Sequence, residues 1–159
     1  MKRYIKTSES TNTSEIIVYH CDDQGMFNGV WQEGMSLDLG LHCSLAIRQV
    51  PCYQLVLHPK YTVTVPDTTS WYNSKTFHDI TELTCGWSLK ESTQKYRELL
   101  RDCNMTPVSK STLLRQFLVN DCKLSGVYYR DEHDGYNDNC ICILDKNIIS
   151  SIQRIQIVK

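Results

Sequence analysis

"MSLDLGLHCSLAI", residues 35–47, has an apolar side chain at every second position without a break. These positions are Met35, Leu37, Leu39, Leu41, Cys43, Leu45 and Ile47. A period of two is typical of a β-strand that buries one face in a core and turns the other toward polar surroundings. We therefore predict a strand over these residues, and Gly40 within it is a suitable place for a bend or bulge.

Further strand patterns lie before and after a central block of helical patterns. β-branched and aromatic residues concentrate in residues 15–21 and 51–66, and residues 25–31 are the expected hairpin partner of the first run. The same residue types return in residues 123–130, 139–144 and 149–159. We predict strands in each of these segments, separated by turns rich in Pro, Gly, Asp and Asn.

Residues 76–120 show helical rather than alternating spacing. Residues 76–87 place an apolar side chain on one helical face at each turn, and Gly86 can end that helix. Ser88 and Glu91 have the spacing of a capping box and predict the start of a second helix. Its expected packing stripe is Leu89, Thr93, Tyr96, Leu100 and Cys103. A third helix is predicted within residues 104–120, with Thr106 or Ser109 as its cap.

The order of these elements predicts the fold class. Strands, then two or three helices, then strands again are typical of an α+β fold, because segregated blocks disfavour a doubly wound parallel sheet. We therefore expect a single α+β domain over residues 15–159, with a mostly antiparallel sheet built from N- and C-terminal strands and two or three central helices. Residues 1–14 are polar and without period, which predicts a flexible N-terminal tail.

Composition narrows the class of protein. The 159 residues are 41% hydrophobic and 22% charged, as in globular domains, and the formal net charge of -1 disfavours a dedicated nucleic-acid binder. The N-terminal residues lack the apolar run of a signal peptide, and no apolar segment approaches the length needed to span a bilayer. We therefore expect a soluble cytoplasmic protein in which the eight cysteines are reduced.

His42 and Cys43 are adjacent residues of types that often carry chemistry. Neighbouring residues of a strand point to opposite faces, so these two cannot form a dyad or bind one metal ion together. We expect Cys43 in the core and His42 on the more polar face, with Asp38 or Ser44 as hydrogen-bond partner. His42 is therefore a candidate member of a binding surface.

Two other groupings of residues resemble metal sites only weakly. Cys140 and Cys142 share one face of a predicted strand, whereas zinc sites usually space cysteines by two to four residues in a turn. The acidic loop at residues 130–139 fails the EF-hand pattern around Gly135. We expect packed thiols, a solvated hairpin loop and a satisfied, largely buried His20, with no metal ion and no cofactor.

Catalytic signatures are missing from the sequence. It contains no Walker A motif, no G-x-G-x-x-G, no G-x-S-x-G and no H-E-x-x-H. Eight cysteines and five histidines allow many Cys-His combinations, but no signature selects one, and the residues around Cys85 only superficially match a papain-type motif. We therefore assign no catalytic residue.

Residues 88–115 carry six basic and three acidic side chains. Arg97 and Arg101 are four residues apart on the predicted second helix, so they can present one basic ridge to a phosphate or to an acidic partner. We assign His42, Arg97 and Arg101 as the candidate binding residues.

These observations favour a non-catalytic intracellular interaction or assembly protein that acts through protein-protein contacts or as a homo-oligomer. High cysteine usage with abundant Ile, Asn and Lys also suits a small viral accessory or structural protein. The alternative is a small enzyme with a Cys or His catalytic residue that acts on a nucleotide or nucleic acid. Nucleic acid is thus the second class of partner that the sequence leaves open.

Overall fold

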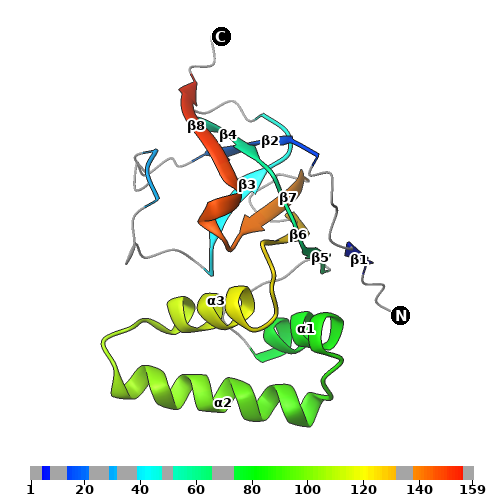
Figure 1. The fold of residues 1–159 in the computed structure, drawn as a ribbon, viewed down its shortest axis with the longest axis vertical. Coiled ribbons are helices and arrows are strands. Elements are labelled where there is room, and N and C mark those ends of the chain that lie inside the picture. Colours follow the sequence, from blue (N-terminus) through cyan, green and yellow to red (C-terminus); the bar gives the residue numbers. More distant parts are fainter. Residues whose placement is uncertain are drawn as a thin grey trace.

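The structure, a computed structural model, describes residues 5–7, 14–21, 29–31, 39–47, 52–65, 74–131 and 138–155. In these ranges strands precede and follow a block of three helices (Figure 1). In chain order the elements are β1 (Ile5–Thr7), β2 (Ile16–Cys21), β3 (Leu41–Ser44), β4 (Cys52–Leu57), β5 (Thr62–Thr64), α1 (Ser74–Cys85), α2 (Leu89–Met105), α3 (Lys110–Asn120), β6 (Gly126–Asp131), β7 (Asp138–Ile143), the 3-10 turn η1 (Lys146–Ile148) and β8 (Ile149–Ile155). The predicted α+β class is confirmed.

The described strands form one mixed sheet in the order β1-β5-β6-β7-β3-β2-β4-β8. Every neighbouring pair is antiparallel except β5 and β6, which run parallel. Parallel neighbours need a crossover connection, and here the three helices supply it, because α1, α2 and α3 all lie between β5 and β6 in the chain. The helices consequently form a layer beside the β5-β6 part of the sheet, while β4 and β8 lie at the far end (Figure 1).

Two apolar cores occupy opposite faces of this sheet. β7 shows the alternation, since Ile141 and Ile143 belong to one core whereas Cys142 and the following Leu144 belong to the other. The first core lies between the sheet and the helices and includes Leu114 of α3. The second core is built mainly from β2, β3, β4 and β7. β7 is therefore buried on both faces, as strands in the middle of a layered fold are.

The helix ends follow the chemistry of their terminal residues. α1 ends before Gly86, whose φ of 68° is a conformation that glycine adopts without a steric penalty. Ser88 caps α2 in a complete capping box with Glu91, as predicted. Of the two predicted caps for the third helix, Ser109 is the one used, and α3 begins at Lys110.

The strand predicted over residues 35–47 is much shorter in the structure. β3 contains only Leu41–Ser44, and residues 35–38 lie outside the described residues. Leu39 has a φ of 57°, so the extended backbone begins only after Gly40. The strand ends at Ser44, although the Leu45 N–H still donates to the Asn139 carbonyl of β7, and the side chains of Leu45 and Ile47 are exposed rather than buried. The prediction of a buried strand was therefore wrong at residues 45–47.

The structure also differs from the prediction at the partner of β2 and at the buried side of α2. β2 pairs with β3 and β4, and Gly29, Val30 and Trp31, the described part of its predicted hairpin partner, form no strand. Residues 5–7 form β1 against β5, but most of residues 1–14 lies outside the described residues, so the flexible tail predicted there stays untested. The buried residues of α2 are Ser92, Tyr96 and Leu99. The packing side of α2 is therefore rotated around the helix axis from the predicted one, and Leu89 is exposed.

Candidate interaction surface

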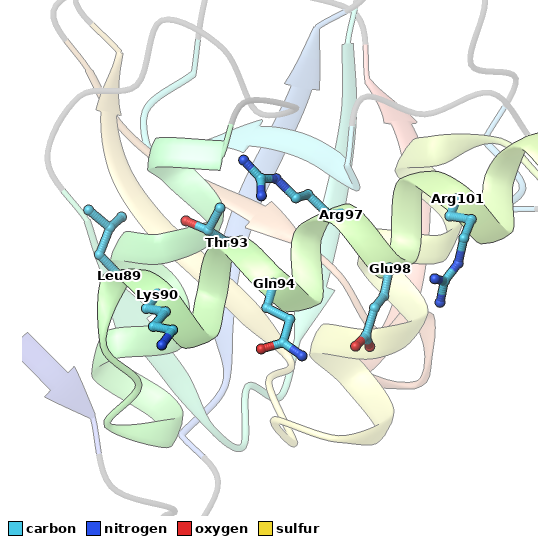
Figure 2. Close-up of a pocket in the computed structure, with 7 residues that line it drawn as sticks. All are labelled: Leu89, Lys90, Thr93, Gln94, Arg97, Glu98 and Arg101. Carbon is cyan, nitrogen blue, oxygen red and sulfur yellow. The ribbon is translucent and has the colours of Figure 1, made fainter.

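The outer side of α2 lines an open hollow with a volume of about 920 Å³ (Figure 2). Its described lining comes from successive turns of this one helix: Leu89, Lys90, Thr93, Gln94, Arg97, Glu98 and Arg101. The opposite side of α2 packs against α1, where the ring centres of Tyr96 and Phe77 lie 5.6 Å apart. We call these seven lining residues the α2 face.

Three of the six basic side chains of residues 88–115 have partners within the described residues that keep them off the α2 face. The ammonium group of Lys95 lies 5.1 Å from the centre of the Phe117 ring, and that of Lys110 lies 5.2 Å from the Tyr96 ring. The guanidinium of Arg115 is buried and donates a hydrogen bond of 2.8 Å to the Leu39 carbonyl. The predicted excess of positive charge is therefore not spread evenly over the helices.

The other three basic residues, Lys90, Arg97 and Arg101, lie on the α2 face. Glu98 is the one acidic residue among them, and its carboxylate lies 3.8 Å from Lys95. Arg97 and Arg101 are exposed, and neither forms an ion pair or hydrogen bond with any residue in the described ranges. The α2 face thus carries a local positive charge that is free to meet an acidic group.

His42, the third predicted binding residue, lies elsewhere. It is half-buried on β3, where its Nδ1 lies 2.8 Å from the hydroxyl oxygen of Tyr129 on β6, and the two rings meet edge to face. The main chain of His42 is also engaged, because its carbonyl oxygen lies 2.7 Å from Nδ1 of His20. The structure therefore places Arg97 and Arg101 on the α2 face, whereas His42 lies on β3 in the sheet.

The side chain of His42 faces Cys142 rather than its neighbour Cys43. The two strands place His42 and Cys142 directly opposite each other, with Nε2 and Sγ 3.8 Å apart. Cys43 points the other way into the second core, as predicted. Cys142 is fully buried, so a substrate has no access to its sulfur in this conformation.

No group of three or more His, Cys, Asp or Glu side chains suited to a metal ion occurs in the described residues. Cys140 and Cys142 are both buried on the side of the sheet that carries His42. Most of the acidic loop at residues 130–139 lies outside the described residues, and the prediction for it stays untested.

The structure brings two cysteines together that no sequence pattern had paired. The sulfur atoms of Cys85, at the end of α1, and Cys122, just after α3, lie 3.5 Å apart. They are 37 residues apart in the chain, so no local spacing motif could have paired them. A second pair, Cys21 and Cys52, occupies opposite positions in the register of β2 and β4.

The chain matches no protein-family model, no curated protein and no solved structure. Within the described residues, no helix has the length and hydrophobicity that crossing a membrane requires.

Proposed function

We propose that this chain is a non-catalytic interaction protein that binds an acidic protein partner through the α2 face. The observation that carries the proposal is the pair Arg97 and Arg101, two guanidinium groups on consecutive turns with no partner among the described residues. Arginine pairs with carboxylates through two parallel hydrogen bonds, and neighbouring arginines favour an acidic segment over a neutral one.

The apolar side chains at the two ends of α2 favour a protein over a nucleic acid. Leu89 is 63% exposed and Met105 is 78% exposed, and Met105 is one turn beyond Arg101. Protein interfaces combine apolar anchors with arginine, whereas contacts with a nucleic-acid backbone are mostly made by basic and small polar side chains. The net charge of -1 also gives the chain no long-range attraction for a polyanion.

The test is a charge reversal on the α2 face. The protein is titrated into a fluorescent peptide with Glu and Leu at helical spacing, and binding is followed by fluorescence anisotropy at several salt concentrations. Arg97→Glu combined with Arg101→Glu is expected to weaken binding by about tenfold or more, because two attractive charges become repulsive. Higher salt is expected to weaken wild-type binding and to reduce the difference between the two proteins.

The matched control is Lys60→Glu combined with Arg154→Glu, which makes the same change in net charge at two exposed residues outside α2. It is expected to bind within about twofold of wild type. Equal losses in both double variants, or a wild-type protein that binds a single-stranded oligonucleotide but not the peptide, would overturn the proposal. A dimer in sedimentation that the α2 variant abolishes would identify the partner as a second copy of the chain.

A second candidate function is an enzyme with a Cys or His catalytic residue acting on a nucleotide or nucleic acid. The observation that favours it is the 3.8 Å approach of His42 Nε2 to Cys142 Sγ, because an adjacent imidazole can activate a thiol. The full burial of Cys142 speaks against it. Mass-spectrometric mapping of a brief reaction with iodoacetamide separates the two candidates, since a catalytic Cys142 would react far faster than the other thiols.

A cytoplasmic location is also part of the proposal, and it rests on the sequence alone. A role as a viral accessory or structural protein likewise stays a prediction from composition.

A further inference from the structure

Cys85 and Cys122 are close enough to react with each other. Both are free thiols, and their sulfur atoms are 3.5 Å apart, whereas the bond in a disulfide is about 2.05 Å long. Cys85 is the last residue of α1, and a β-carbon on Gly86 after it would meet nothing within 4 Å, so the chain is not tightly packed on that side. A shift of about 1.5 Å at this helix end would therefore bring the sulfurs into bonding distance.

The two thiols differ in access to solvent. Cys85 is exposed, whereas Cys122 is buried. Burial is the main reason that the pKa of the Cys122 thiol is raised to about 12, so this thiol stays protonated near neutral pH. An external reagent therefore meets Cys85 first, and Cys122 is placed to react second.

We propose that Cys85 and Cys122 form a reversible thiol modification site, in which a low-molecular-weight disulfide such as oxidised glutathione reacts with Cys85 and Cys122 then closes a Cys85-Cys122 disulfide. This inference is independent of the proposed function.

Both steps are thiol-disulfide exchanges. In the first, the Cys85 thiolate attacks one sulfur of oxidised glutathione, the bond between the two glutathione sulfurs breaks, and one glutathione leaves and takes up the proton that Cys85 lost. In the second, the Cys122 thiolate attacks the Cys85 sulfur and releases the other glutathione, which takes up the proton of Cys122. Two protein thiols are oxidised to one disulfide, and one oxidised glutathione is reduced to two thiols.

The surroundings suit a reagent of this class. Cys122 opens onto a surface hollow of about 610 Å³ beside Thr84. The charged residues that line this hollow are Lys60, Asp121, Lys123 and Asp145. Glutathione carries carboxylates and an ammonium group, so both signs of charge on the wall can contribute to holding it beside Cys122, whose sulfur lies 3.5 Å from that of Cys85.

The experiment is peptide mapping of the full chain after equilibration with mixtures of reduced and oxidised glutathione. Thiols are blocked by acid quenching and alkylation, and the protein is digested with trypsin. Trypsin isolates Cys85 in residues 76–90, Cys122 in residues 116–123 and Cys103 in residues 102–110, so each thiol is read separately. Cys103→Ser is the matched control, because Cys103 donates its thiol hydrogen to the Val108 carbonyl within the helical layer.

In wild type and in Cys103→Ser, the disulfide-linked pair 76–90 with 116–123 is expected to grow with the oxidised fraction and to disappear on reduction. Cys122→Ala is expected to stop at the glutathione adduct on Cys85, and Cys85→Ser is expected to give neither product. Closure is expected to accelerate about tenfold per pH unit between about pH 7 and 9, because the thiolate fraction of Cys122 rises in proportion. The closed form is expected to melt about 10 °C higher than the reduced form.

Three results would overturn the inference. The first is a stable glutathione adduct on Cys85 of the wild type with no linked pair. The second is a linked pair that involves Cys103 or another cysteine instead. The third is a Cys85-Cys122 disulfide that resists a large excess of reduced glutathione, which would make it a permanent structural bond. The wild-type and Cys103→Ser mapping decides all three even where substitution of the buried Cys122 disturbs folding.

Discussion

The imidazole of His42 lies where three strands meet. β3 supplies the ring, β6 supplies the hydroxyl of Tyr129 at 2.8 Å from Nδ1, and β7 supplies the Cys142 sulfur at 3.8 Å from Nε2. A half-buried imidazole loses part of its hydration, so such contacts replace hydrogen bonds that the ring would make with water. His42 therefore links β3 to β6 and β7 through polar side-chain contacts.

Removing the Tyr129 hydroxyl tests this role. Tyr129→Phe keeps the edge-to-face ring contact with His42 but removes the hydrogen-bond partner of Nδ1. We expect the free energy of unfolding, measured by urea denaturation, to fall by about 1 kcal/mol.

The neighbouring residue gives the control. The Tyr128 ring contacts the second core, and its hydroxyl makes no hydrogen bond to any of the described residues. Tyr128→Phe is expected to leave the free energy of unfolding within about 0.5 kcal/mol of wild type. If both variants lost the same stability, the hydrogen bond between His42 and Tyr129 would contribute nothing to the free energy of unfolding.

Individual residues were predictable only where a local rule fixes them. The period of two placed Cys43 and His42 on opposite faces, because strand geometry allows no other arrangement. Their partners were not predictable, since Tyr129 and Cys142 are 87 and 100 residues away from His42 in the chain. Cys122 was missed as the partner of Cys85 for the same reason.

Among the elements, β3 shows how backbone contact overrides a side-chain pattern. Gly40 lies so close to β7 that a β-carbon there would collide with the Ile143 carbonyl oxygen and lie 2.9 Å from the Cys142 sulfur. The predicted bend at Gly40 is thus accompanied by a close approach of two backbones. The hydrophobic alternation of residues 35–47 contains no sign of where this approach begins or where the strand leaves the sheet.

Two alanine substitutions separate packing from conformational freedom. Gly40→Ala is expected to lower the free energy of unfolding by about 3 kcal/mol, because a carbonyl oxygen in a sheet cannot move aside cheaply. Gly86→Ala is expected to lower it by only about 1 kcal/mol, because a β-carbon there meets nothing within 4 Å and the cost is the positive φ alone. Urea denaturation of both variants measures the two costs, and a smaller loss for Gly40→Ala would refute the close approach.

The α2 helix was predicted accurately at its start and less so around its circumference. The capping box fixes Ser88 because it depends on residues three apart. The buried side depends on where α1 and α3 lie, and they cover Ser92, Tyr96 and Leu99 rather than Leu89. That Arg97 and Arg101 lie on the same side of α2 was predictable from their spacing alone, since residues four apart are neighbours on any helix.

For the whole molecule, the segregated order of strands and helices was sufficient to predict the α+β class. It did not predict that β5 and β6 run parallel, because the helical block between them could equally have returned the chain beside an antiparallel neighbour. Nor did it predict two cores, since β7 reads as a short apolar run and its residues alternate between both cores only once the sheet is covered on each face.

The two cores share strand β7, so we can ask whether they unfold together. Leu114 on α3 belongs to the core under the helices, and Leu55 on β4 belongs to the core on the other face. Each is almost completely buried, so Leu114→Ala and Leu55→Ala are each expected to lower the free energy of unfolding by about 2–5 kcal/mol.

Because β7 contributes to both cores, loss of either core also removes packing from the strand that supports the other. We therefore expect helices and strands to unfold at the same urea concentration in wild type and in both variants. Far-ultraviolet circular dichroism follows the helices, and hydrogen exchange of the β2 and β4 amides follows the far part of the sheet. If Leu114→Ala melted the helices while the β2 and β4 amides stayed protected, the two cores would be separate cooperative units and the sharing of β7 would not couple them.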